Sequence, residues 1–423
     1  MMDTTLALLL AGGQGSRLNI LAKHRAKPAV PFAGIYRIID FTLSNLMHGR
    51  VENVGILTQY RPSSLIDHIQ TGESWGFYGR NRSVTVLPPY IGEDASSWYE
   101  GTADAVYQNR SFIARFPEAE YILILSGDHI YKMDYQKLIA SHIERRAVLT
   151  VVAMSIPIHE ASRFGTIIAD EKDRIIGFEE KPKKPKSNLV SMGIYLFNRD
   201  VLLASLNEDA KTKDSHRDFG RDILPKFLNK KMFIYKFNDY WRDVGTLQSY
   251  WETSMDILNN VSDFDIQRWQ VRTNLNSKIV TDRKPGYVGK TANIKNSLIS
   301  DGCIINGMVE NSILSPGVII EKDVFIKDSI IFNDTRICSK SIIDRCIIDK
   351  DVVIGNCAKL GTGLMKAPSN KDFPSHANTG ITIVGKAANV PKGVTVGRNC
   401  IIYPAVTRNS FNKKRYESGE TVR

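Results

Sequence analysis

Aliphatic residues recur every six positions through the C-terminal part of the chain, and this period limits what that part can fold into. A period of six is typical of the hexapeptide repeat of a parallel β-helix, in which each repeat forms one short strand of a triangular coil. Antiparallel hairpins are the alternative, although they give a period of two and do not hold a register at six. One series is broken at Arg336 and a second follows it. The two series are Val318, Val324, Ile330, Ile342, Ile348 and Ile354, then Val384, Val390, Val396 and Ile402.

The first 260 residues follow another pattern, in which apolar runs alternate with helical stretches. The runs are typical of buried strands in an α/β sheet, where ligands collect at the carboxyl ends of strands. They are Leu6–Ala11, Val54–Thr58, Tyr121–Ser126 and Val148–Met154. We therefore expect a catalytic domain over 1–260, a linker over 261–286, and a β-helix domain over 287–423 that serves oligomerisation and regulation.

The length and composition of the chain argue against several classes of protein. A chain of 423 residues suggests two or three domains. Its 43% hydrophobic and 24% charged residues are near the averages of soluble globular proteins and argue against disordered, collagen-like or membrane-spanning chains. No apolar run reaches the roughly 18 residues of a membrane helix, and Met1–Thr5 lacks the basic start of a secretory signal. We expect a cytoplasmic protein without a membrane partner.

The charge balance favours anionic partners. There are 56 Lys and Arg against 45 Asp and Glu, a net charge of +11. This excess does not choose between nucleic acid and small phosphates, but the chain contains no recognised nucleic-acid module, so we expect no nucleic-acid partner.

The five cysteines are odd in number and form no C-x-x-C pair. Buried thiols of a reducing compartment fit this pattern better than a disulfide framework or a zinc site.

A glycine-rich turn follows the first apolar run. Gly12, Gly13 and Gly15 let backbone N–H groups approach an anion, and a helix beginning after them would add partial positive charge. Leu18 stands where a dinucleotide fingerprint needs its last glycine, and no Gly-Lys-Ser/Thr ends the loop as a P-loop requires. The turn therefore indicates phosphate binding together with Arg17, or else a simple tight turn.

A basic segment comes next in the chain. Arg25 and Lys27 stand beside Pro28 and could neutralise a triphosphate or its leaving pyrophosphate. A solvated basic turn is the plainer interpretation of these residues alone.

Asp128 directly follows a strongly apolar strand. A carboxylate at a strand end suits Mg²⁺, which prefers oxygen ligands, and Asp243 in Trp-Arg-Asp-Val-Gly-Thr offers a partner carboxylate. The alternative for Asp128 is a helix cap or turn residue. For His129 a structural role is favoured over that of a base.

An acid and a lysine stand together in Glu180-Lys181-Pro182. The lysine could meet a sugar phosphate as a point charge, and Glu180 could accept hydrogen bonds from hydroxyls. The lysines that follow, up to Lys186, are typical of a solvated loop.

Read together, these segments resemble the bacterial glucose-1-phosphate adenylyltransferases, also called ADP-glucose pyrophosphorylases. The resemblance covers nearly the whole chain, and the stretches around Tyr99 and Asp128 are its most specific part. The matching segments are Ala11–Leu18, Arg25–Val30, Arg37–Phe41, Thr58–Tyr60, Trp98–Val106, Gly127–Tyr131, Glu180–Pro182, Ser191–Tyr195 and Tyr240–Thr246.

The resemblance implies a fold, a reaction and partners. The fold is an α/β, Rossmann-like (GT-A-like) nucleotidyltransferase domain followed by a left-handed parallel β-helix of hexapeptide repeats. The reaction is metal-dependent exchange of ATP and α-D-glucose 1-phosphate for ADP-glucose and pyrophosphate in glycogen synthesis. Small phosphorylated allosteric effectors and a homotetramer are further implied.

The resemblance also implies residue roles. Asp128 and Asp243 would hold Mg²⁺, and Arg17 and Lys27 would meet the ATP phosphates, so that Arg17, Lys27 and Asp128 are the expected catalytic residues. Tyr99 would lie near the adenosine, and Glu180 with Lys181 would hold glucose 1-phosphate. The expected substrate-binding residues are Gly12, Gly13, Gly15, Tyr99, Gly101, Gly165, Glu180, Lys181, Ser191 and Asp243.

Other classes of protein stay open at this point. One keeps the fold but uses another nucleoside triphosphate, such as UTP or dTTP. A second is a non-catalytic regulatory subunit, which should have lost acid or cation motifs that this chain retains. A third, an acyltransferase built on the hexapeptide β-helix, leaves the glycine-rich turn unexplained.

Overall fold

The computed structural model describes the chain except residues 1–3, 14, 90–97, 260, 262–263 and 277–281. The described chain forms two compact units. The first contains residues 1–13 and 41–241, and the second contains residues 14–40 and 242–423. The predicted boundaries at 260 and 286 stay a prediction.

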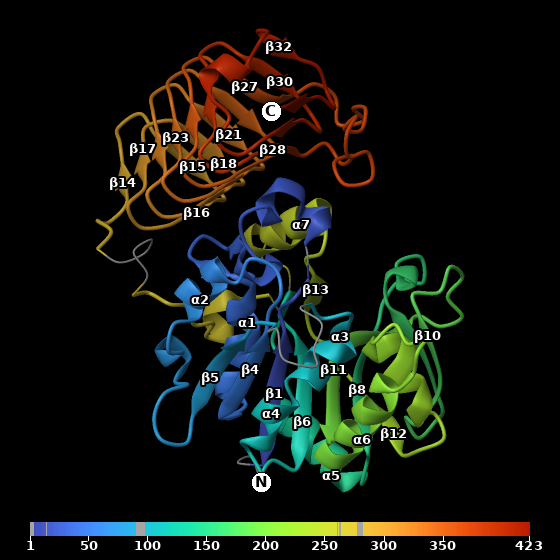
Figure 1. The fold of residues 1–423 in the computed structure, drawn as a ribbon. Coiled ribbons are helices and arrows are strands. Elements are labelled where there is room, and N and C mark those ends of the chain that lie inside the picture. Colours follow the sequence, from blue (N-terminus) through green and yellow to red (C-terminus); the bar gives the residue numbers. More distant parts are fainter. Residues whose placement is uncertain (1–3, 14, 90–97, 260, 262–263, 277–281) are drawn as a thin grey trace. The chain divides into compact units, whose positions relative to one another are not determined.

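A nine-stranded mixed sheet forms the centre of the first unit (Figure 1). Its strand order is β10-β9-β11-β6-β1-β4-β5, and β8 pairs with both β11 and β12. The strands are β1 (Thr5–Leu10), β4 (Asn53–Leu57), β5 (Ser83–Leu87), β6 (Tyr121–Ser126), β8 (Leu149–Ser155), β9 (Gly165–Ala169), β10 (Ile175–Glu180), β11 (Leu189–Asn198) and β12 (Met232–Lys236).

Helices accompany this sheet along the chain. They are α1 (Ile38–His48), α2 (Ser63–Ile69), α3 (Thr102–Gln108), α4 (Arg110–Ala114), α5 (Tyr135–Glu144) and α6 (Arg199–Ala210). A separate two-stranded sheet pairs β7 (His129–Tyr131) with β13 (Trp241–Asp243).

The sheet confirms all four strands predicted from apolar runs. β1 lies between β4 and β6 and is parallel to both, so it is buried almost throughout. Such a position explains the continuous Leu-rich sequence of β1, since strands covered on both faces lack polar alternation. In the part of the chain that the structure describes, we find no helix long and apolar enough to cross a membrane.

The C-terminal part of the second unit is a parallel β-helix, as predicted. Three sheets of short parallel strands run along it: β14-β17-β20-β23-β26-β29, β15-β18-β21-β24-β27-β30-β32 and β16-β19-β22-β25-β28-β31-β33 (Figure 1). The strands with even spacing include β20 (Ile319–Ile320), β21 (Phe325–Lys327), β22 (Ile330–Ile331), β23 (Arg336–Ile337), β24 (Ile342–Asp344), β25 (Cys346–Ile348) and β26 (Val353–Ile354).

The remaining strands of the β-helix are equally short. They are β14 (Tyr287–Val288), β15 (Asn293–Lys295), β16 (Leu298–Ile299), β17 (Ile304–Ile305), β18 (Met308–Glu310), β19 (Ile313–Leu314), β27 (Lys359–Thr362), β28 (Thr382–Val384), β29 (Asn389–Val390), β30 (Thr395–Gly397), β31 (Ile401–Ile402), β32 (Arg415–Tyr416) and β33 (Thr421–Val422). Outside it, the second unit contains β2 (Pro31–Phe32), β3 (Tyr36–Arg37), α7 (Leu247–Leu258) and α8 (Ile266–Trp269).

The first six-residue series is wrong in part. Paired residues of neighbouring coils are 17 positions apart in the sequence, as Ile320 is from Ile337 and Ile337 from Ile354. Three steps of six residues would need 18, so one strand-to-strand step in each coil is five residues long. The interior rows therefore hold Ile331 and Ile343 where the series placed Ile330 and Ile342. The break at Arg336 has the same cause, because Ile337 points inward and Arg336 is exposed beside Glu321.

The second series is confirmed. Val384, Val390, Val396 and Ile402 all belong to the buried core of the β-helix. The expectation of buried thiols is confirmed for Cys303, Cys346 and Cys400 of the same core, whereas Cys338 is half-buried and Cys357 is exposed.

A buried ion pair joins the N-terminal segment of the second unit to the β-helix. The Nη2 atom of Arg25 donates to both carboxylate oxygens of Asp349 at 2.9 Å. The guanidinium that the sequence offered for a triphosphate is therefore engaged by an aspartate of the β-helix. The next residue, Lys350, is half-buried, and desolvation of its ammonium group, together with the nearby charges of Arg37 and Arg25, lowers its pKa to about 7.

The lowered pKa of Lys350 predicts a pH-dependent stability. Between about pH 7 and 10.5 Lys350 binds a proton in the unfolded chain but not in the folded one. The free energy of unfolding should therefore rise with pH in this window, by up to about 1.4 kcal/mol per pH unit. Below pH 7 Lys350 is protonated in both the folded and the unfolded chain, so its destabilising effect no longer changes with pH.

Lys350→Met removes this group at similar volume. We expect the variant to be more stable than the wild type at pH 7 and its advantage to shrink toward pH 10. Urea unfolding of both chains at several pH values measures the difference, in which other titrating groups cancel. A difference independent of pH would contradict the assignment.

Candidate active site

The carboxyl ends of β1, β4 and β6 lie side by side in the first unit. The backbone N–H of Ala11 donates to the carbonyl of Leu57 at 2.8 Å, and that of Gly127 donates to the carbonyl of Leu10 at 3.0 Å. These bonds place Gly12 and Gly13, after β1, at the same sheet edge as Asp128, after β6. A Cβ atom at Gly13 would meet no other atom within 4 Å, so the backbone there is open.

Gly15 turns the chain into the second unit. It has a φ of 65°, and a Cβ atom there would lie 2.8 Å from the Cβ of Ala22 and 3.3 Å from that of Lys27. Glycine is therefore required by conformation and by space. The segment that follows, Ser16–Ala22, is a 3₁₀ helix with non-helical torsions at Asn19.

Three predicted residues gather in the second unit. The Nζ atom of Lys27 lies 3.2 Å from Oδ1 of Asp243, and both side chains are largely buried. A Cβ atom at Gly245 would lie 2.9 Å from the Asp243 carboxylate and 3.1 Å from Nη2 of Arg17. Gly245 thus leaves room for an arginine and a carboxylate at one place.

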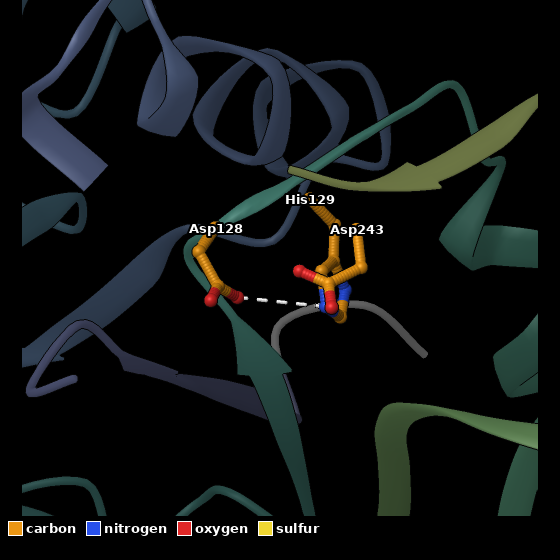
Figure 2. A group of neighbouring side chains, drawn as sticks. All are labelled: Asp128, His129 and Asp243. Atoms are coloured by element: carbon orange, nitrogen blue, oxygen red, sulfur yellow. Dashed lines mark ion pairs between the residues drawn. The ribbon is translucent and has the colours of Figure 1, made fainter. Parts of the chain in front are cut away.

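Figure 2 draws Asp128 and His129 of the first unit together with Asp243 of the second. Asp128 accepts a hydrogen bond from Ser126, and its Oδ1 is 3.5 Å from Nε2 of His129. Two carboxylates and an imidazole are a donor set that can hold a divalent cation.

Glu180 lies at the end of β10, in a space that two glycines leave open. A Cβ atom at Gly165 would be 2.8 Å from its Oε2, and one at Gly220 would be 2.4 Å away. Its Oε1 lies 2.9 Å from Nζ of Lys181, whose side chain is 60% exposed. The glutamate is thus held by packing, whereas the lysine extends into solvent.

Ser191 belongs to β11 and contacts a buried tyrosine. Its hydroxyl donates to the hydroxyl of Tyr195 at 3.4 Å and accepts from the backbone N–H of Gly193 at 3.2 Å. Burial raises the pKa of Tyr195, and the carboxylates of Glu180 and Asp218 raise it further. Tyr195 therefore stays a neutral hydroxyl close to these acids.

Tyr99 is a buried residue with a fixed hydroxyl. The hydroxyl donates to the carbonyl of Leu87 at 3.2 Å and accepts from Nδ2 of Asn109 at 2.9 Å. Its own carbonyl accepts from Gln59 at 3.3 Å. Gly101, two residues later, immediately precedes α3 and packs against the carbonyl of Arg217.

The sequence patterns leave several residues of this region unexplained. The structural role expected of His129 stays a prediction, and its buried Nδ1 atom finds no hydrogen-bond partner among the described residues. Trp241, whose ring contacts that of His129 at 5.3 Å, also has a buried ring nitrogen without a partner there. Gly220 carried no local motif, because its contact with Glu180 is made only in the folded chain.

Comparison with known families identifies the class. A family model described as nucleotidyl transferase matches residues 6–260, and one described as a GlmU-like C-terminal hexapeptide matches residues 276–384. The chain is therefore a nucleotidyltransferase with an appended hexapeptide β-helix, and the predicted fold class is confirmed.

Individual relatives show to which family of nucleotidyltransferases the chain belongs. The chain is 43% identical to the glucose-1-phosphate adenylyltransferase of Acetivibrio thermocellus, over 99% of this chain and 97% of the relative. It is 46% identical to the enzyme of the same name from Thermomicrobium roseum, over 100% of this chain and 98% of the relative. The corresponding protein of Clostridium acetobutylicum is 49% identical over 76% of this chain and 84% of its own length. The chain belongs to the glucose-1-phosphate adenylyltransferase family, as its motifs predicted.

Proposed function

We propose that the chain transfers AMP from ATP to α-D-glucose 1-phosphate, giving ADP-glucose and pyrophosphate for glycogen synthesis. The observation that carries this proposal is the similarity over nearly the whole chain to relatives named for that activity. The acids and cations gathered at the candidate site support it, because phosphoryl chemistry needs charge neutralisation more than a protein nucleophile.

The proposed reaction is one in-line displacement. An oxygen of the sugar phosphate forms a bond to the α-phosphorus of ATP, while the bond from that phosphorus to the bridging oxygen breaks. The leaving pyrophosphate takes the electron pair. Little proton transfer is needed when a phosphate dianion attacks, so the protein acts by positioning and by electrostatic stabilisation.

Asp128 and Asp243 are the proposed ligands of Mg²⁺. Their carboxylates fit this hard cation, which prefers oxygen, whereas the imidazole of His129 suits a softer metal. When bound, Mg²⁺ would neutralise charge on the triphosphate.

Arg17, Lys27 and the glycine-rich turn are the proposed phosphate contacts. Lys27 is buried and already beside a carboxylate, so its charge is held in place before a substrate arrives. The open backbone at Gly13, together with Gly12 and Gly15, would allow N–H groups to approach phosphate oxygens.

The sugar phosphate is assigned to Glu180, Lys181, Ser191 and Gly165. The packed Glu180 would accept hydrogen bonds from sugar hydroxyls, and the extended Lys181 would meet the phosphate. Tyr99 and Gly101 are assigned to the adenosine side.

Further partners belong to the same proposal. Small phosphorylated effectors are proposed because the resemblance to the family implies them. We also propose a cytoplasmic homotetramer, for which light scattering of the purified chain measures the mass.

Replacing Asp128 tests the catalytic assignment. Asp128→Asn should lower kcat about a hundredfold or more, because it removes a charge from the proposed metal site. Radiolabelled ADP-glucose formation, with Mg²⁺ present and after chelation, measures the effect. Asp134→Asn is the matched control, since Asp134 caps α5 by accepting from the backbone of Gln136 and asparagine can do the same.

Two outcomes would contradict this proposal. Unchanged turnover in Asp128→Asn, or indifference of the wild type to divalent metal, would remove the proposed role of the carboxylates. A clear preference for UTP or dTTP over ATP would replace the adenylyl assignment by another nucleotidyl transfer.

Replacing Gly220 tests the sugar-phosphate side. The added Cβ of Gly220→Ala would displace the carboxylate of Glu180, which sits at the end of a flexible side chain, so the fold should survive. Loss of a charge-assisted hydrogen bond should raise KM for glucose 1-phosphate about tenfold. KM for ATP should change little, as measured by steady-state kinetics with each substrate varied.

Gly177→Ala is the control for this variant. Gly177 lies in the same strand as Glu180, and a Cβ there would lie 3.3 Å from Ile168 and away from the carboxylate. If both alanine variants changed KM equally, the assignment of Glu180 to the sugar phosphate would fail.

A further inference from the structure

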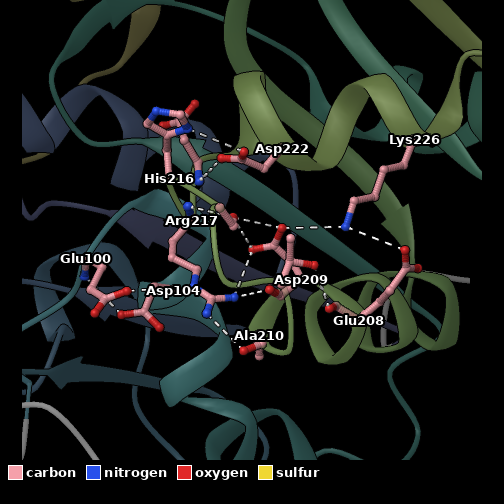
Figure 3. Close-up of polar contacts among 12 residues, drawn as sticks. Glu100, Asp104, Glu208, Asp209, Ala210, His216, Arg217, Asp222 and Lys226 are labelled. Carbon is pink, nitrogen blue, oxygen red and sulfur yellow. Dashed lines mark hydrogen bonds and ion pairs between the residues drawn. The ribbon is translucent and has the colours of Figure 1, made fainter.

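Arg217 lies where α6 ends and α3 begins, within a network of polar contacts (Figure 3). It belongs to the segment 215–222 of the first unit and has a φ of 55°, which is uncommon for a residue other than glycine. The side chain of Arg217 contacts the end of α6, whereas its backbone carbonyl contacts the start of α3.

The side chain of Arg217 caps the C-terminus of α6. Nη2 donates to the carbonyl of Ala210 at 2.9 Å, and Nη1 donates to that of Asp209. The last carbonyls of a helix lack intrahelical partners, and a cation near them is favourable. Nη1 also lies 3.6 Å from the buried carboxylate of Asp209.

The carbonyl of Arg217 caps the N-terminus of α3. It accepts from the backbone N–H of Ala103 at 2.8 Å and of Asp104 at 3.3 Å. The residue before α3 is Gly101, which has no side chain to cap the helix. A Cβ atom at Gly101 would lie 2.3 Å from this carbonyl, so glycine is what permits the approach.

The chain that follows Arg217 packs on the proposed sugar-phosphate side. Thr102 of α3 donates to Asp218 at 3.0 Å and accepts from the backbone of Phe219 at 3.0 Å. The ring of Phe219 lies 5.7 Å from that of Tyr195, and Gly220 lies against Glu180.

We propose that Arg217 is a positioning residue that fixes the adenosine side of the site relative to the sugar-phosphate side. It touches neither substrate, but it joins the start of α3, next to Tyr99 and Gly101, to the segment that packs on Glu180. The inference rests on the proposed function, since it uses the roles given to these residues there.

The ion pair of Arg217 with Glu100 contributes little to this positioning. Its Nε to Oε2 distance is 3.7 Å and the glutamate side chain is 61% exposed, and exposed ion pairs contribute little. The bonds to main-chain carbonyls therefore carry the positioning.

Arg217→Gln tests the proposal because glutamine cannot reach both carbonyls of α6. Tyr99 and Glu180 keep their own contacts, so each substrate should still bind alone. KM for each substrate at saturation of the other should rise about tenfold, because the two no longer fit together. The Kd of ATP alone, measured by calorimetry, should stay within about threefold. Arg217→Lys should recover part of the loss.

Arg199→Gln is the matched control. Nη1 of Arg199 also donates to two main-chain carbonyls, those of Phe116 and Pro117 at 3.1 and 2.8 Å, at the other end of α6. This variant should lower the thermal midpoint by about as much as Arg217→Gln does, and it should leave both KM values unchanged.

Three results would overturn the inference in distinguishable ways. If Arg217→Gln behaves as Arg199→Gln does, Arg217 only stabilises the fold. If Kd of ATP alone rises as much as KM, Arg217 acts as a direct binding residue. If the wild-type chain makes no ADP-glucose from ATP and glucose 1-phosphate, the proposed function itself fails and the inference fails with it.

Discussion

The parallel pairing of β1 with both β4 and β6 is the interaction on which the candidate site depends. It is made by apolar strands buried on both faces, and it brings three strand ends to one edge of the sheet. The hydrogen bonds of Ala11 and Gly127 continue the pairing past these ends. The glycine-rich turn and Asp128 are thus adjacent because of hydrophobic burial elsewhere, and their polar groups need no attraction to one another to meet.

The charged residues of the site form pairs among themselves. Lys27 lies beside Asp243, Lys181 beside Glu180, and Arg25 on Asp349. Burying the charge of Lys27 or of Arg25 alone would be costly, and the paired aspartate offsets that cost.

The sequence was most informative where chemistry and secondary structure are both local. Strand positions, the glycine-rich turn and the family motifs could be read from short segments, and the β-helix from its aliphatic period. The one-residue shift at Ile331 and Ile343 could not, because it depends on which coil pairs with which. The same limit applies to Gly220 and Arg217, whose partners lie far away in the sequence and whose residue types indicate nothing alone.

The coils of the β-helix tolerate unequal lengths. In one sheet, successive partners are Leu314, Ile331, Ile348, Val384, Ile402 and Val422, all buried although the sequence intervals range from 17 to 36 residues. Each strand is aligned by its neighbour and not by a count along the chain. Insertions and deletions at the corners can therefore accumulate without disturbing the interior, which makes this half of the molecule the natural place for lineages to diverge in length.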